Sequence, residues 1–216
     1  MHIVEGYLPF SHAVAWTAIS APFAVHSARA VRQAVDTSRV MRMRLAASGA
    51  FVLLLSSLKL PSVAGSSSHP TGTGLGSVLV GAAAMPTLAG LVLLFQAILL
   101  AHGGLTTLGA NLFSLGVVGP WMAVGTYRLM VRVRCSAVVA AGCAATLADL
   151  ATYATTSLQL ALAFPQSQGG VTAAFLKFAA VFAFTQLPLA ALEGVFTSLV
   201  WRALHGVETT PAPRSA

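Results

Sequence analysis

Long apolar stretches separated by short polar ones dominate the pattern of this chain of 216 residues. The apolar stretches cover residues 8–28, 45–60, 75–101, 111–131, 135–163 and 171–203. A hydrocarbon layer about 30 Å thick is crossed by roughly 20 apolar residues of helix, and most of these stretches approach or exceed that length. The pattern therefore predicts an all-α integral membrane protein with about seven transmembrane helices, in a single domain over residues 1–216.

The stretch at 75–101 admits two interpretations. It is interrupted by Met85-Pro86 and by Gln96. A single helix would cross the membrane once, whereas two short helices that turn near Pro86 would cross it twice. Short helices are tolerated where they surround a polar site inside the protein. Two crossings also return a later arginine cluster to the side of the earlier one, as the positive-inside tendency favours; this cluster consists of Arg128, Arg132 and Arg134.

Basic residues set the expected orientation of the chain. Residues 29–44 hold Arg29, Arg32, Arg39, Arg42 and Arg44 against Asp36 alone. Such a stretch is typical of a cytoplasmic loop, so we expect the N-terminus on the outer side. The polar loop at 61–76 then lies outside, and residues 204–216 form a cytoplasmic tail.

Composition supports a membrane protein and argues against other classes. The chain is 56% hydrophobic and only 8% charged, with a net charge of +7, whereas a soluble domain carries roughly 25% charged residues. A basic excess in a soluble protein would suggest nucleic acid, but here the arginines lie in short connections, so we expect a lipid bilayer and no nucleic-acid partner. The first basic side chain is Arg29, after the first apolar stretch, so no cleavable signal is expected and Met1 should be the mature N-terminus.

Polar and ionisable residues in so apolar a chain are its functional candidates. On the outer half they are His2, Glu5, His12, His69, His102 and Asn111. Imidazole binds zinc, copper, nickel and cobalt, whereas calcium and magnesium prefer several oxygen ligands. Because carboxylates are nearly absent on this side, a bound cation is expected to be a transition metal that favours nitrogen.

The second residue has a special position for metal binding. A terminal amine, the backbone nitrogen of His2 and its imidazole can form fused chelate rings on one ion. A fourth nitrogen, from a distant imidazole, would complete a planar set, which suits Ni(II) and Cu(II) and also low-spin Co(II). Because the metal displaces protons from the amine and the amide, binding should weaken as the pH falls.

Each histidine also has a simpler interpretation. His2 could be incidental, His69 a hydrogen-bonded loop residue and His102 a helix cap. A structural membrane scaffold would bind no metal and would tolerate His69→Ala. An intramembrane metalloenzyme would need an open coordination position and a general base, but Glu5 is the only nearby outer carboxylate and the sequence has no HExxH motif.

Three separated motifs, in order, resemble those of one family. They are MHIVEGYLP at 1–9, GSSSHPTGTGLG at 65–76 and FQAILLAHGGLTTLGANLFSLGVVGP at 95–120, and PLAALEG at 188–194 extends the similarity over nearly the whole chain. Together they resemble the CbiM/NikM family, the substrate-specific subunits of cobalt and nickel energy-coupling factor transporters, and look most like its cobalt branch.

The resemblance implies a ligand set and an architecture. The metal would be held by the amine of Met1, the backbone nitrogen and imidazole of His2, and the imidazole of His69. Residues 1–28 would be a helix added to a six-helix core at 45–203, carrying the N-terminus to the site. Other polar groups would hydrogen-bond the ligands and fix their orientation; the candidates are Ser67, Ser68, Thr71 and Asn111.

The resemblance also implies a function and partners. The chain would be a non-catalytic subunit of the prokaryotic inner membrane that binds Co(II) and supplies it for cobalamin biosynthesis, with no further cofactor. Ni(II) is the alternative cargo, because both ions suit the same nitrogen set. The sequence has no GxxxxGK[ST] phosphate loop, so ATP hydrolysis would belong to partners: a CbiQ-like coupling subunit, a CbiO-like ATPase and a small CbiN-like accessory subunit.

Overall fold

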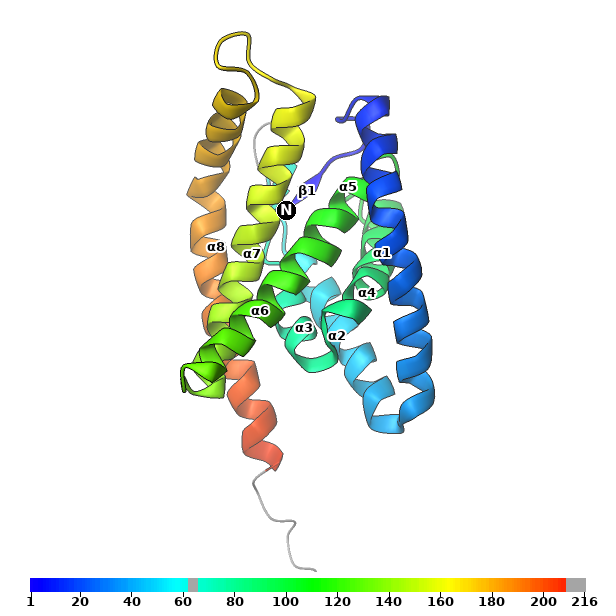
Figure 1. The fold of residues 1–216 in the computed structure, drawn as a ribbon, viewed down its shortest axis with the longest axis vertical. Coiled ribbons are helices and arrows are strands. Elements are labelled where there is room, and N and C mark those ends of the chain that lie inside the picture. Colours follow the sequence, from blue (N-terminus) through cyan, green and yellow to red (C-terminus); the bar gives the residue numbers. More distant parts are fainter. Residues whose placement is uncertain (62–65, 209–216) are drawn as a thin grey trace, which may run out of the picture.

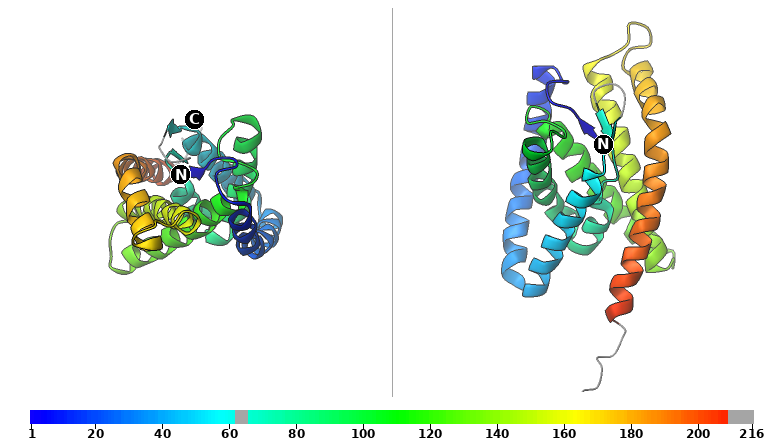
Figure 2. Two further views of the ribbon diagram at one scale, coloured as in Figure 1. Left: turned by 90° about the horizontal axis from the view of Figure 1, so that it is seen from above. Right: turned by 180° about the vertical axis from the view of Figure 1, so that it is seen from behind.

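The computed structural model describes residues 1–61 and 66–208 as a helical bundle with a small sheet inside it (Figures 1 and 2). The α-helices are α1 (Phe10–Thr37), α2 (Arg39–Ser57), α3 (Thr73–Val80), α4 (Met85–Leu99), α5 (Leu108–Leu112), α6 (Gly119–Arg132), α7 (Ala137–Ala163) and α8 (Gly170–Glu208). A 3₁₀ turn, η1 (Ala82–Ala84), precedes α4, and a π-helical segment, η2 (Phe113–Val118), joins α5 to α6. With α5, η2 and α6 taken as one helix, the described residues form seven helices, which confirms the predicted all-α class.

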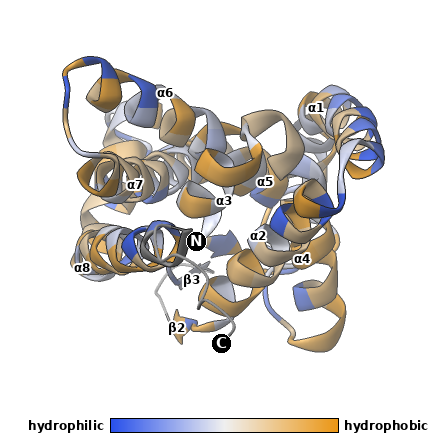
Figure 3. Ribbon diagram, turned by 90° about the horizontal axis from the view of Figure 1, so that it is seen from below, coloured by the Kyte–Doolittle hydropathy of each residue, from blue (hydrophilic) through white to orange (hydrophobic). Residues whose placement is uncertain are grey.

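Five of these helical segments are long and apolar enough to cross a membrane, within the part of the chain described. They are α2, η1 with α4, α5 through α6, α7 and α8. Large hydrophobic side chains such as Phe184 on α8 are exposed on the outside, and hydrophobic positions run along most helices in Figure 3. The chain is thus a multi-pass membrane protein.

The arginine-bearing connections lie at one end of the bundle. Figure 1 places the turn between α1 and α2, the connection between α6 and α7 and the last turns of α8 at the lower end, opposite the connection between α7 and α8. Arg39 begins α2 and Arg132 ends α6. The predicted positive clusters therefore share one end, as a single membrane face requires.

The expected loop at 29–44 is helical, so that prediction of conformation was wrong. Helix α1 continues to Thr37 and α2 begins at Arg39. Only Ser38 is extended, and its hydroxyl accepts a hydrogen bond from the Met41 amide. The reason is that alanine, arginine and methionine are good helix formers, so one N-capping serine is enough to reverse the chain.

The stretch at 75–101 holds two short helices, as the second interpretation expected, but the turn lies elsewhere and only the segment with α4 is long enough to span a membrane. Gly81, with φ of 87°, ends α3, whereas Pro86 lies in the first turn of α4, where proline is well tolerated. Helix α3 has eight residues, about 12 Å, too short to cross alone. It packs inside the bundle: a Cβ added to Gly74 would lie 2.4 Å from the Cα of Ala145 on α7.

The described part of the polar stretch at 61–76 contains regular secondary structure, where a loop was expected. Residues 66–68 form a strand and Thr73 begins α3, while 62–65 lie outside the described residues. The expected tail at 204–216 begins as the last turns of α8, and 209–216 lie outside the described residues.

Candidate metal centre

The start of the chain lies at the centre of the bundle, held by a three-stranded antiparallel sheet (Figure 1). The sheet has the order β1 (His2–Ile3), β3 (Ser66–Ser68), β2 (Leu60–Pro61). His2 lies opposite Ser67 in the β1–β3 pair. Strand pairing provides partners for backbone polar groups, so it allows non-helical chain to lie inside an apolar protein.

Side chains from α5 and the loop before it hold the backbone next to His2. The Ile3 amide donates to Asn111 Oδ1 at 2.8 Å, and Asn111 Nδ2 donates to the Ile3 carbonyl at 3.0 Å. Thr107 Oγ1 also donates to that carbonyl, at 2.8 Å. Asn111, expected near the ligands, thus contacts the backbone beside His2 and fixes where β1 lies.

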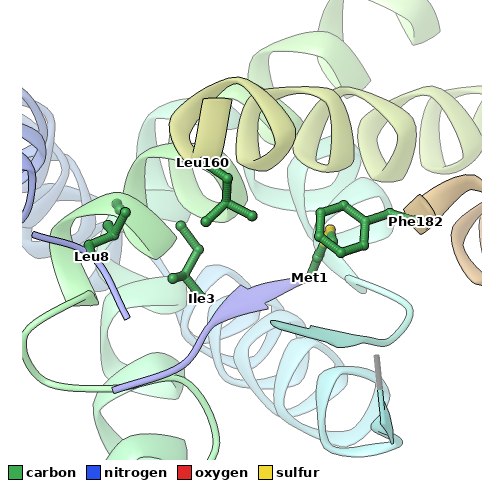
Figure 4. Close-up of a cluster of buried hydrophobic side chains, with 6 residues drawn as sticks. Met1, Ile3, Leu8, Leu160 and Phe182 are labelled. Atoms are coloured by element: carbon green, nitrogen blue, oxygen red, sulfur yellow. The ribbon is translucent and has the colours of Figure 1, made fainter. Parts of the chain in front are cut away.

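The side chain of Met1 anchors the end of this strand. It is fully buried and belongs to an apolar cluster with Ile3, Leu8, Leu160 and Phe182, shown in Figure 4. The thioether lies beside the Phe182 ring of α8 in that view. Burying a side chain of this size stabilises the strand by about 1.5–3 kcal/mol, so the terminal amine is held in one place.

Three imidazoles meet beside this strand. The rings of His2 and His69 have centroids 4.3 Å apart, and His102 lies 4.5 Å from His2 and 5.0 Å from His69. One ligand nitrogen from each lies within 4.8 Å of the others. All three side chains are buried. The structure thus brings together His2 and His69, the predicted ligands, and adds His102, an outer candidate for which a helix cap was the simpler interpretation.

The nitrogens of these rings are divided between tethered and unpaired atoms. His69 Nδ1 lies 2.8 Å from the Pro70 carbonyl oxygen, and His102 Nε2 lies 2.7 Å from Ser67 Oγ. Both nitrogens of His2, Nε2 of His69 and Nδ1 of His102 have no hydrogen-bond partner among the described residues. Buried polar atoms are normally paired, so this cluster of unpaired nitrogens is the chemistry expected of a metal site.

Burial also keeps these groups unprotonated. The terminal amine and the histidines lie outside the membrane-spanning segments. Burial lowers the pKa of the Met1 amine from 8.0 to about 5, although the carboxylates of Asp149 and Glu193 act in the opposite direction. Burial likewise holds the pKa values of His2 and His69 well below 6.5 and lowers that of His102 to about 4. At neutral pH the lone pairs are therefore available to a cation.

The predicted hydroxyl residues have separate partners. Ser67 contacts the His102 ring, as described above. Ser68 Oγ lies 2.8 Å from Thr185 Oγ1 on α8, and Thr71 Oγ1 donates to Glu193 at 2.9 Å. Of these three residues, Ser67 contacts an imidazole, while Ser68 and Thr71 fasten the His69 segment to α8.

Two side chains of α8 hold the segment that carries His69. The Glu193 carboxylate accepts from the Thr71 amide, the Thr71 hydroxyl and, at 2.8 Å, the Gly72 amide. Gln186 Nε2 donates to the His69 carbonyl at 3.3 Å and to Asp149 Oδ1 at 2.7 Å. These hydrogen bonds tie the backbone of residues 69–72 to α8, so α8 fixes where His69 lies.

Sequence reasoning missed Glu193, Gln186 and Asp149 as residues of this site. The sequence held a signal for them, because polar and ionisable residues within transmembrane helices are rare and usually functional. Two other sequence candidates stand apart from the imidazoles. Glu5 accepts from the Thr106 amide at 3.1 Å, and His12 lies on α1 outside the histidine cluster.

Comparison with known proteins identifies relatives over nearly the whole chain. The family described as the "cobalt uptake substrate-specific transmembrane region" matches residues 2–210. A "Cobalt transport protein CbiM" from Moorella thermoacetica is 56% identical over 204 residues, 94% of this chain and 79% of the relative. The protein of that name from Streptomyces coelicolor is 53% identical over 94% of this chain and 88% of its own.

Solved structures with the same fold are also known. A crystal structure of a transition metal transporter aligns with a TM-score of 0.85 at 26% identity, over 98% of this chain and 95% of that one. A truncated transition metal transporter aligns with a TM-score of 0.82 at 25% identity, over 95% and 99% of the two chains.

Proposed function

This chain belongs to the CbiM family of cobalt uptake proteins, and we propose that it captures Co(II) at the buried site between β1 and the His69 segment. The single observation that carries the proposal is the group of unpaired imidazole nitrogens beside a buried terminal amine. A transition ion favoured by nitrogen would complete their coordination.

The ligands in this proposal are the Met1 amine, the backbone nitrogen and imidazole of His2, and Nε2 of His69. The first three belong to adjacent positions of one chain, so they form fused chelate rings. His69 Nδ1 is held by the Pro70 carbonyl, which leaves Nε2 to face the metal, in the way that second contacts orient metal-binding histidines. Asn111 and Ser67 support the set through Ile3 and the β1–β3 pair.

Transport through such a site needs an energy source outside this chain. The ligands are buried, so release into the cell requires the bundle to open, and the sequence carries no phosphate loop for ATP. We therefore assign ATP hydrolysis to a CbiO-like ATPase and force transmission to a CbiQ-like coupling subunit, with a CbiN-like accessory subunit. The cobalt would serve cobalamin biosynthesis.

Metal content of the purified chain tests the site. The protein carries its native N-terminus and a C-terminal tag, and is loaded separately with Co(II) and Ni(II). We expect one metal per chain in the native protein and none in His2→Ala, His69→Ala or a variant with one glycine ahead of Met1. His26→Ala, an exposed imidazole on α1, is the matched control and should bind normally.

Each outcome of this experiment is decisive. Undiminished cobalt in the extended protein would exclude the amine as a ligand. Undiminished cobalt in His69→Ala would make His69 a loop residue only. A strong preference for nickel in the native protein would replace cobalt by nickel as the cargo.

A further inference from the structure

One imidazole of the cluster has no place in the planar nitrogen set. That set takes one ring from His2 and one from His69, and it is complete with four nitrogens. His102 nevertheless offers a ligand atom within 4.8 Å of those of the other two rings. It comes from a third part of the chain, the loop between α4 and α5. Its ring is tilted by 50° to that of His2 and by 87° to that of His69, so the three rings are not coplanar.

His102 shares the tethering pattern of His69. In each ring one nitrogen is fixed by an oxygen, from Pro70 for His69 and from Ser67 for His102, while the other nitrogen has no partner among the described residues. Metal-binding histidines characteristically use one nitrogen for the ion and the other for an orienting hydrogen bond. In a helix cap, a ring nitrogen would instead form a hydrogen bond with a backbone group.

The loop around His102 is fixed against β1. The Glu5 amide donates to the Gly103 carbonyl at 3.0 Å, and the His102 amide donates to the Gln96 carbonyl at 3.0 Å. Gly103 has φ of 76°, and a Cβ added there would lie 3.3 Å from Asn111 Nδ2. The imidazole is therefore held beside the ligands by the backbone on both sides of it.

We propose that His102 is an axial ligand, through Nδ1, and that it makes the site prefer Co(II) to Ni(II). The inference rests on the proposed planar set. In a strong planar nitrogen field, d⁸ Ni(II) is low-spin with a filled orbital along the axis, so an axial imidazole gains nothing. Low-spin d⁷ Co(II) has a single electron in that orbital and forms an axial bond. A tethered imidazole on the axis thus stabilises the cobalt complex selectively.

The test compares both metals in the intact protein with its native N-terminus. Dissociation constants for Co(II) and Ni(II) are measured by competition for the native chain, His102→Ala and the control His26→Ala. Anaerobic electron paramagnetic resonance of the Co(II) forms gives an independent readout, because an axial nitrogen splits the cobalt lines into triplets. His102→Gln, whose amide can still contact Ser67, serves if His102→Ala does not fold.

We expect His102→Ala to weaken Co(II) binding by about 10–100-fold, to leave Ni(II) binding within about twofold, and to abolish the triplets. His26→Ala should match the native chain. Equal losses for both metals, or retained triplets, would overturn the axial role and leave His102 a packing residue. Unchanged cobalt affinity would overturn it too. No binding of either metal by the native chain would instead overturn the proposed function, and this inference with it.

Discussion

Two loops bring an imidazole to the N-terminal strand, and they are held by different parts of the molecule. The segment with His69 is fastened to α8 through Glu193 and Gln186. The loop with His102 is fastened to the turn that follows β1: the Thr106 amide donates to Glu5 Oε2 at 3.1 Å, and the Gly6 amide donates to Thr106 Oγ1 at 3.1 Å.

The difference gives the two imidazoles different anchors. The His102 loop is tied to Glu5 and Gly6, whereas the His69 segment is tied to α8, a helix that extends to the arginine-bearing end of the bundle (Figure 1). The β1–β3 pairing and the contact of Ser67 with His102 connect the two. The position of α8 therefore affects His69 directly, and it affects His2 and His102 only through β3.

Removing the anchor on α8 should have the largest effect. In Glu193→Ala three buried donors lose their carboxylate, so we expect the free energy of unfolding to fall by about 2–4 kcal/mol and cobalt affinity to fall by about 10–100-fold. Glu193→Gln should be milder, because its amide oxygen still accepts. Thermal unfolding and competition binding measure both quantities, with the exposed neighbour Leu192→Ala as control. Native cobalt affinity in Glu193→Ala would show that His69 does not depend on α8.

Displacing the His102 loop from Glu5 should have the second largest effect. A Cβ at Gly104 would lie 2.3 Å from Glu5 Oε2 and 2.5 Å from Glu5 Cα. Backbone must move to accept it, so Gly104→Ala should destabilise the protein by about 1–3 kcal/mol and weaken cobalt binding by about tenfold. Gly125→Ala on α6, which has open space, is the matched control in the same assays. Equal behaviour of the two variants would mean that the strand and the loop are not coupled.

The pH dependence of binding tests whether burial keeps the proposed ligands unprotonated at both anchors. A lowered pKa leaves a group unprotonated at all pH values above it, so the Met1 amine competes with protons only below about pH 5. From pH 8 to 6 only the His2 amide proton is displaced, and apparent cobalt affinity should fall by about tenfold per unit. Competition titrations measure this slope. A steeper fall between pH 8 and 6 would show that the amine or an imidazole takes up protons there.

The smallest effect should come from the hydroxyl that tethers His102. A neutral hydrogen bond contributes about 1 kcal/mol, so Ser67→Ala should weaken cobalt binding by about fivefold. Ser68→Ala, whose hydroxyl contacts Thr185 instead, should leave cobalt affinity unchanged. The same competition assay serves for both, and a larger loss in Ser68→Ala would reverse their assigned roles.

Much of the architecture follows from the apolar pattern. The apolar stretches mark where the helices lie, because the middle of each long helix is apolar and its ends are polar. The prediction of a loop at 29–44 was wrong, because the arginines that mark a membrane face are also good helix formers. The turn was expected near Pro86 but lies at Gly81, because the glycine, with φ of 87°, ends α3, whereas the proline fits the first turn of α4.

The candidate site was predictable only in part. The N-terminal motif and the SSSH motif pointed to His2 and His69, and those rings lie together. His102 was less visible, because its proximity arises from the packing of the α4–α5 loop against β1, which no local pattern specifies. Glu193 and Gln186 act through contacts made across more than a hundred positions of sequence, and such pairings emerge only from the tertiary fold.

The burial of Met1 against Leu160 and Phe182 has a consequence for biosynthesis. Met1 can take this place only after α7 and α8, which carry Leu160 and Phe182, have been made. Contacts between such distant positions form slowly, because a long loop must close before they stabilise anything. A chain that still lacks α7 and α8 therefore lacks the packing that holds Met1, so the proposed cobalt site can form only after both helices have been made.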